Sequence, residues 1–214
     1  YEAEPALIER MIAYEKSRLA FDEGIIVKDR SAEAKTPVDI HIFSCGGRRF
    51  EPQGWYWQLW VGLMTARSRG QVRPMRRDGA LHFAIEHNHL SDEAGHDMRV
   101  MMSGIASARR IAAAEPLASM LRSEIAPGPS VKDAALESWA RDNHVCYFHP
   151  AGSCPIGNDP EAGAVVDEKC RVHGLKGVMV ADASVMPQVT AANTNIPTAA
   201  LAHRLARHID AIAG

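Results

Sequence analysis

His149 and Asn193 are the two residues whose types and surroundings suit acid–base chemistry. His149 stands before a Pro-Ala-Gly segment and Asn193 follows two alanines, so small neighbours would let a substrate approach closely. An imidazole accepts a proton near neutral pH, whereas an amide holds an oxygen atom without titrating. A single histidine is more often structural, so from residue type alone the pair is only a candidate site.

Cysteine and histidine also recur at a spacing that suits zinc. Two residues separate Cys146 from His149, and two separate Cys170 from His173. Together they would complete the tetrahedral shell of a structural zinc site. Against this, His149 directly precedes a proline, and Cys170 and His173 lead into an expected strand. A zinc-stabilised, non-catalytic binding module stays an alternative.

A second group of histidines lies between an expected strand end and a polar loop: His82, His87, His89 and His96. Histidine is a common metal ligand, but this spacing has no regular period. We interpret the group as part of a solvated loop and predict no metal site.

The elements around His149 and Asn193 are expected to form an α/β unit. Residues 177–181 are a short apolar run, typical of a buried parallel strand, which would end at Asp182. Asn195 is expected to cap a final helix that has Pro197 in its first turn. The loop between strand and helix is in a position that often carries function.

The middle of the chain predicts at least three strands, in antiparallel arrangement. Residues 38–42 alternate apolar and polar side chains, which is the period of a strand. Residues 71–76 and 81–85 predict two more strands, joined by a turn at Asp78-Gly79. Helices are expected after Ser91 and around Trp139, and near the N-terminus from Pro5.

Trp55, Tyr56 and Trp57 form a dense aromatic segment. Such clusters are usually core, but aromatic side chains also line substrate pockets. These three are therefore candidates for substrate contact.

Composition excludes several classes of protein. The 214 residues are 46% hydrophobic and 23% charged, which is ordinary for a globular protein. A net charge of -2 gives no basic field, so nucleic acid is not an expected partner. No apolar run is long enough for a membrane span, and no signal peptide is visible. Four cysteines are too few for a disulfide scaffold, which favours the cytoplasm, with a periplasmic or secreted location left open.

Several short motifs occur in one order near the C-terminus: HPAGSCPIG at residues 149–157, VVD at 165–167, RVHG at 171–174, VADASVMP at 180–187 and NTNIP at 193–197. Others precede them: PVDIH at residues 37–41, SRGQVR at 68–73 and NHLSD at 88–92. Together they closely resemble the C-terminal portion of the glucose–methanol–choline (GMC) flavin oxidoreductases. The family more often has threonine at Ser153, Arg-Met after Cys154 and tyrosine at Phe148, while the position of Asn193 is asparagine or histidine.

The resemblance implies an FAD-dependent oxidation of an alcohol to an aldehyde or ketone. His149 would be the base and Asn193 would bind the substrate oxygen while hydride passes to flavin N5. Residues implied to contact FAD are Phe148, Ala181, Asp182, Ala183, Asn193, Thr194, Asn195 and Pro197. Some relatives are hydroxynitrile lyases that keep FAD without using its redox chemistry, which is a second alternative.

The implied fold is α+β. It consists of an N-terminal helix and linker (residues 1–36), an antiparallel-sheet substrate-binding domain (37–142), and a catalytic loop with the C-terminal part of a Rossmann-like FAD domain (143–214). FAD enzymes of this kind use a Gly-x-Gly-x-x-Gly turn, which this chain lacks. Because the chain also begins with Tyr1, we predict that a separate N-terminal FAD-binding polypeptide or fragment completes the site.

Overall fold

The computed structural model describes residues 4–6, 9, 26–49 and 54–213. The chain forms two compact units. The first unit contains Tyr1–Leu63 and Asp92–Val145, and the second contains Met64–Ser91 and Cys146–Gly214. The helix expected from Pro5 falls mostly outside the described residues.

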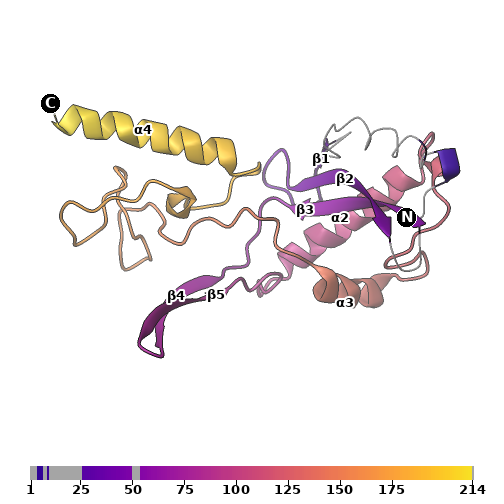
Figure 1. Cartoon of the computed structure of the whole chain (residues 1–214), viewed down its shortest axis with the longest axis horizontal. Helices are drawn as coiled ribbons and strands as arrows, with labels where there is room; N and C mark the ends of the chain where they lie inside the picture. Colours follow the sequence, from indigo (N-terminus) through magenta and orange to yellow (C-terminus); the bar gives the residue numbers. More distant parts are fainter. Residues whose placement is uncertain (1–3, 7–8, 10–25, 50–53, 214) are drawn as a thin grey trace. The chain divides into compact units, whose positions relative to one another are not determined.

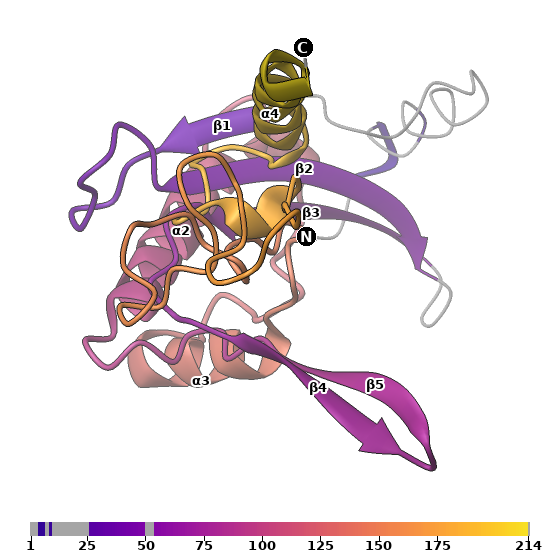
Figure 2. The same cartoon turned by 90° about the vertical axis from the view of Figure 1, so that its left-hand side faces the viewer.

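The first unit is built on an antiparallel sheet. Its strands are β1 (Ile26–Asp29), β2 (Ile40–Arg49) and β3 (Gly54–Leu63), in the order β1-β2-β3. The strand predicted from the alternation at residues 38–42 is confirmed as β2. Helix α2 (His96–Ala112) crosses one face of this sheet (Figure 2).

The contact between α2 and the sheet forms the core of the first unit. Val100 and Ala108 of α2 pack with Ile40 and Ile42 of β2, and all four are buried. Gly104 allows the close approach, because a Cβ there would lie 2.4 Å from Val61 Cγ1. The core of this unit is therefore a helix laid on an antiparallel sheet.

Helix α2 begins later than the sequence indicated. Gly95 has a φ of 63°, which interrupts the helix expected after Ser91. The Asp92 carboxylate accepts the backbone N–H groups of His96 at 2.6 Å and Asp97 at 3.1 Å, so it stabilises the true first turn. Further along, the short helix η1 (Ala118–Met120) precedes α3 (Asp133–Asn143), which is the helix expected around Trp139.

In the second unit, β4 (Gln71–Arg77) and β5 (Ala80–Glu86) form the predicted hairpin, visible as one twisted ribbon in Figure 1. Asp78 and Gly79 have φ angles of 52° and 78°, as a type I′ turn requires. At the open end of the hairpin, Gly70 is tightly enclosed. A Cβ there would lie 2.1 Å from the Glu86 carbonyl oxygen.

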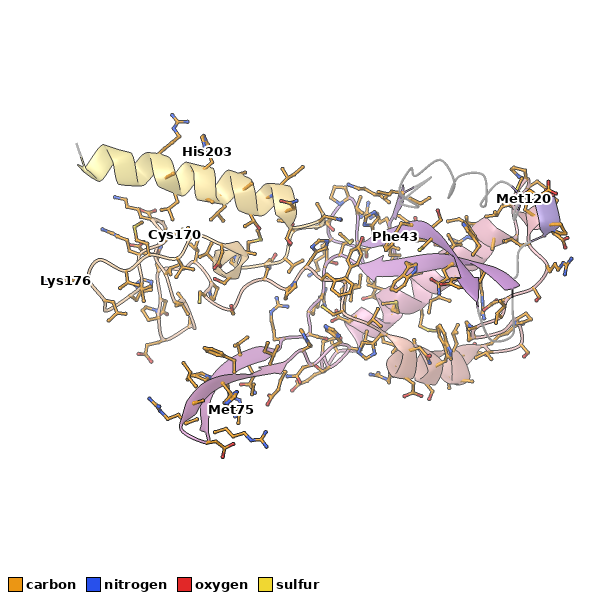
Figure 3. The ribbon with its side chains drawn as sticks, viewed as in Figure 1. Phe43, Met75, Met120, Cys170, Lys176 and His203 are labelled. Atoms are coloured by element: carbon orange, nitrogen blue, oxygen red, sulfur yellow. The ribbon has the colours of Figure 1, made fainter. Side chains whose placement is uncertain are left out.

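The C-terminal part of the second unit consists of loops, the short helix η2 (Ala183–Val185) and the long helix α4 (Asn195–Ala213). Val166, Cys170, Val185 and Leu205 form its buried core. Figure 3 shows Cys170 among the loops below α4, while His203 points away from them. The predicted final helix is thus confirmed.

The strand expected at residues 177–181 is wrong. Within the described chain this run makes only an isolated antiparallel bridge, between Arg171 and Met179. A strand needs a neighbour that satisfies its backbone along its length. The apolar side chains instead serve the loop core, where Met179 and Val180 pack beside Val166.

Across the described residues, no helix combines the length and the apolar character that crossing a lipid bilayer requires.

Candidate active site

The loop of His149 meets the start of α4 through one hydrogen bond. His149 Nδ1 lies 3.1 Å from Thr194 Oγ1, and Thr194 is buried. The Tyr147 ring packs against the imidazole in a T-shaped contact, with ring centroids 5.1 Å apart at 82°. The imidazole is therefore held on two sides, and the loops that carry His149 and Asn193 converge at residues 149 and 194.

The tautomer of His149 decides what its outer nitrogen can do. If Nδ1–H donates to Thr194, Nε2 keeps a free lone pair and can accept a proton. If the Thr194 hydroxyl donates to Nδ1, Nε2 carries the hydrogen and cannot act as a base. The first arrangement is the one that suits general base catalysis.

Backbone hydrogen bonds attach the residues after His149 to η2. Gly152 N–H donates to Ala183 O at 3.2 Å, and Cys154 N–H donates to Ser184 O at 2.8 Å. Gly152 has a φ of 84°, and a Cβ there would lie 3.0 Å from Met186 O. The loop after His149 can follow this path because residue 152 has no side chain.

Asp182 begins η2 and does not end a strand. Its Oδ1 accepts the backbone N–H of Ser184 at 2.8 Å. Hydrogen bonds from the Ser184 side chain and then its backbone hold the pKa of Asp182 below its usual value. Asp182 and Ala181 are exposed and Ala183 is half-buried, so this carboxylate is a charged and accessible group.

Several sequence neighbours of His149 and Thr194 are exposed, and they include both apolar and polar residues. Phe148 is 82% exposed and has a φ of 63°, and Ile196 is 80% exposed. Asn193 and Asn195 are also exposed, while Pro197 is half-buried. Helix geometry leaves the first N–H groups of α4 without intrahelical acceptors. An accessible aromatic ring on one of the two connected segments, and N–H donors at the helix start on the other, fit a flat, partly anionic cofactor such as a flavin.

Two details of this region differ from the expectation. Asn195 was expected to cap α4, but it is the first residue of the helix, and Thr194 precedes it. Thr194 O accepts both the N–H and the hydroxyl of Thr198, at 2.9 Å and 2.7 Å. Thr194 was expected to contact the cofactor, and its bond to His149 was missed. The available signal was only its place directly after Asn193.

The aromatic segment lies in the first unit, on β3. Tyr56 and Trp57 are half-buried, and the Trp55 side chain lies outside the described part of the chain. Successive residues of a strand point to opposite faces, so Tyr56 and Trp57 lie on opposite faces of β3. Substrate contact by these residues stays a prediction.

The structure separates the four ligands of the zinc alternative. His173 Nε2 lies 2.9 Å from Gly157 O, and His149 Nδ1 is engaged by Thr194. Burial raises the pKa of the Cys170 thiol, which disfavours the thiolate that zinc requires. Cys146 instead lies near two histidines from the other group, His87 and His89.

Comparison with known proteins identifies the family of this chain. The sequence profile of the GMC oxidoreductase C-terminal region matches residues 66–202. An oxygen-dependent choline dehydrogenase of Klebsiella pneumoniae (strain 342) is 35% identical over 91% of this chain and 34% of its own length. Choline oxidase of Arthrobacter globiformis is 38% identical over 69% of this chain and 27% of its own length.

A solved structure shows the same fold. Formate oxidase of Aspergillus oryzae RIB40, from work on its FAD modification, superposes with a TM-score of 0.78 at 20% identity. The match covers 97% of this chain and 42% of that one. The chain thus spans less than half the length of the proteins it matches. It belongs to the GMC oxidoreductase family, whose cofactor is FAD.

Proposed function

We propose that this chain supplies the catalytic base and part of the FAD site of an enzyme that oxidises an alcohol to an aldehyde or ketone. The observation that carries the proposal is the His149–Thr194 hydrogen bond. It fixes the imidazole through Nδ1 and leaves Nε2 for the substrate. Family membership supports the redox chemistry, since the two relatives are named as a choline dehydrogenase and a choline oxidase.

In this proposal, His149 Nε2 accepts the proton of the substrate hydroxyl. Bound FAD supplies the acceptor, flavin N5, for the hydride that leaves the substrate carbon. Asn193 donates a hydrogen bond to the substrate oxygen and so orients the carbon–hydrogen bond. A positioned general base is typically worth about 10²–10⁴ in rate.

The groups that would hold FAD come from both sides of the His149–Thr194 contact. The start of α4 offers N–H donors to negative charge that develops on the reduced cofactor. The Phe148 ring offers an exposed apolar face, and the segment at Asp182 offers polar contacts. The proposed cofactor residues are Phe148, Ala181, Asp182, Ala183, Asn193, Thr194, Asn195 and Pro197.

The rest of the FAD site would come from an N-terminal FAD-binding polypeptide or fragment with a glycine-rich turn. The 214 residues contain no Gly-x-Gly-x-x-Gly sequence, and a dinucleotide cofactor needs such a turn to bring its pyrophosphate close to the backbone. A denaturing gel of the native enzyme distinguishes two polypeptides from one long chain.

Choline is the first alcohol to test, because it appears in the names of both relatives. Its quaternary ammonium group is of the kind that aromatic side chains recognise, and Tyr56 and Trp57 are candidates for that contact. A panel of alcohols should include choline and an uncharged analogue of equal size, each assayed with and without air to separate an oxidase from a dehydrogenase.

The decisive variant is His149→Ala in the flavin-loaded protein. Turnover should fall by about 10²–10⁴ while the flavin absorbance stays unchanged. The matched control is His203→Ala, because His203 is an exposed histidine on the outer side of α4. Full turnover in His149→Ala would overturn the assignment. Cyanide release without flavin bleaching would identify a hydroxynitrile lyase instead.

A further inference from the structure

Three potential metal ligands outside the proposed active site gather at the base of the β4–β5 hairpin. His87 and His89 follow β5, and Cys146 begins the C-terminal part of the second unit. One ligand atom from each lies within 4.8 Å of the other two. The two imidazole rings are stacked, with centroids 5.0 Å apart and 28° between their planes. Residues from distant parts of the sequence thus converge on one point.

The segment that carries the histidines is fixed by contacts that do not use them. Asn88, with a φ of 49°, brings the residues on either side of it together, and its Nδ2 donates to Arg69 O at 3.3 Å. Ser91 N–H donates to Ser68 Oγ at 2.9 Å. Leu90 is buried. The histidine pair therefore belongs to a preformed turn.

Gly70 is also required for this turn. A Cβ at Gly70 would lie 2.8 Å from the carbonyl oxygen of His87, besides its contact with Glu86. The segment that leads into β4 can therefore lie directly against the backbone of His87. The shape of the cluster depends on the hairpin base as well as on the histidine loop.

Cys146 is placed as a metal-bound thiolate would be. Its Sγ accepts the backbone N–H of Phe148 at 3.3 Å, and the side chain is half-buried beside exposed histidines. A backbone donor to the sulfur is a common second contact of a ligating thiolate, which it stabilises and orients. The thiol is thus partly shielded but accessible from the side of the imidazoles.

Although the spacing of the histidines alone predicted no metal site, we infer that His87, His89 and Cys146 form a binding site for a zinc-class divalent ion, with one coordination position left open. Two imidazoles and one thiolate are the donor types that zinc and its neighbours prefer, and three protein ligands leave a fourth tetrahedral position for water. The exposure of both histidines gives the ion a path from solvent.

Modest side-chain motion completes the geometry. With zinc bonds of about 2.0–2.3 Å, tetrahedral donor atoms lie roughly 3.5 Å apart. The ligand atoms, within 4.8 Å of one another, would need to approach by about 1 Å. Rotation of exposed histidine side chains allows this without moving the backbone.

The site would join two segments of the second unit. Cys146 lies three residues before His149, and His87 and His89 lie at the base of the hairpin. A bound ion would therefore connect the hairpin to the segment that carries the proposed base. The inference itself does not depend on that base.

The test is metal binding by the native, flavin-loaded protein after chelator treatment. We expect one equivalent of Zn²⁺ per chain in competition with a chromophoric chelator. Substitution with Co²⁺ should give a thiolate-to-metal charge-transfer band, which reports a bond to sulfur directly.

Variants assign the ligands. His87→Gln should weaken Zn²⁺ binding by more than 100-fold, since even second-shell changes cost about 10–100-fold. Cys146→Ser should abolish the charge-transfer band. Cys146→His should retain Zn²⁺ binding without that band, which separates loss of the thiolate from loss of folding.

Controls use the same residue types nearby. His82→Gln changes an exposed histidine on β5, and Cys154→Ser changes another free cysteine of the same unit. Both should keep the band and the affinity. An unchanged affinity in both Cys146→Ser and His87→Gln, or a cobalt spectrum without the band in the parent protein, would overturn the inference.

Discussion

The proposed base can accept a proton only if the nitrogen that faces the substrate carries no hydrogen. The hydrogen of the neutral imidazole must then be on the other nitrogen. We expect Thr194 to keep that hydrogen on Nδ1, because its hydroxyl engages Nδ1 of His149 from a buried position. The threonine is a positioning residue, since it would act through the imidazole and not on the reacting atoms. A variant that lacks the hydroxyl should therefore have a lower kcat for the same reaction.

Thr194→Val removes the hydroxyl but keeps the shape of the side chain. We expect kcat to fall by about 10-fold, less than for His149→Ala, because the imidazole loses one orienting hydrogen bond worth roughly 1 kcal/mol. Steady-state kinetics with a saturating alcohol measures the change.

The conservative variant and a control separate positioning from damage to the helix. Thr194→Ser should restore most of kcat because it keeps the hydroxyl. Thr198→Val removes the neighbouring hydroxyl, which donates to the Thr194 carbonyl oxygen and not to the imidazole. Equal losses in Thr194→Val and Thr194→Ser would rule out the hydrogen bond as the cause.

At the scale of elements, the second unit depends on turns more than on strands. Asp167 forms one of these turns by accepting the backbone N–H groups of Lys169 and Arg171, both at 2.9 Å. Its other oxygen accepts Arg171 Nε at 2.8 Å. The Arg171 side chain, with backbone hydrogen bonds, lowers the pKa of Asp167 to about 2.

This low pKa predicts how stability depends on pH. A carboxylate with a pKa lowered by folding stabilises the protein fully above its unfolded pKa of about 3.9. The contribution disappears as the pH falls towards the folded pKa of about 2. The Tm difference between the parent protein and Asp167→Asn should therefore be largest above about pH 4 and should shrink towards about pH 2.

Thermal melts across this range measure the effect, and Asp159→Asn is the control. Asp159 also begins a turn, by accepting the Glu161 N–H at 3.0 Å. Its Tm difference from the parent protein should not follow the same pH course. The Asp167–Arg171 ion pair is partly exposed, so its effect on Tm should be modest and should weaken with added salt. A Tm gap that widened on acidification would contradict this account.

A second element-scale prediction concerns the loop after His149, the proposed base. Gly152→Ala places a Cβ 3.0 Å from Met186 O at a φ of 84°, so it should lower both stability and kcat. The left-handed conformation alone costs roughly 1–2 kcal/mol. Gly163→Ala has a φ of 93° but open space around it, so it should lower Tm and leave kcat unchanged. A Gly152→Ala enzyme with normal kcat would show that the loop tolerates displacement.

The sequence was sufficient for elements whose signals are local. The Asp78-Gly79 turn, the strands on either side of it and the final helix follow from residue types within a few positions. The apolar run at residues 177–181 led to a wrong prediction of a strand, because an apolar segment can pack in the core formed by loops as well as in a sheet. Nothing local distinguishes the two.

Contacts between distant residues were beyond the sequence. The meeting of Thr194 with His149 and of Cys146 with His87 depends on how loops close in space. Spacing along the chain left a zinc shell of Cys146, His149, Cys170 and His173 as an alternative, and the only cluster of potential ligands among the described residues is a different one. Family resemblance suggested which residues form the site but gave no information on which nitrogen of His149 is engaged.

At the scale of the whole molecule, the hairpin shows an apolar face that this unit does not bury. By register, Val72 pairs with Ile85, Pro74 with Phe83 and Arg76 with Leu81, so these residues share one face. Leu81 and Phe83 are each 59% exposed, and Ile85 is 61% exposed. Since the chain spans less than half the length of its relatives, we expect the proposed FAD-binding segment to cover this face.

Phe83→Ser tests that expectation. The side chain is already exposed, so the variant should barely change the stability of the hairpin, but it should weaken flavin retention in the native enzyme. Gel filtration with detection of flavin absorbance measures the retention. Arg73→Ser, on the opposite face of the hairpin, is the control. Complete retention in Phe83→Ser would mean that another surface receives the partner segment.

His149 and Thr194 belong to the same compact unit, whereas the aromatic strand belongs to the other. The hydrogen bond that orients the imidazole thus lies within one unit, and the residues expected to contact the alcohol lie in the other. Chimeras that exchange the first unit between relatives should inherit a new substrate preference and keep their proton acceptor aligned. That result would make reactivity and selectivity separable for the protein engineer.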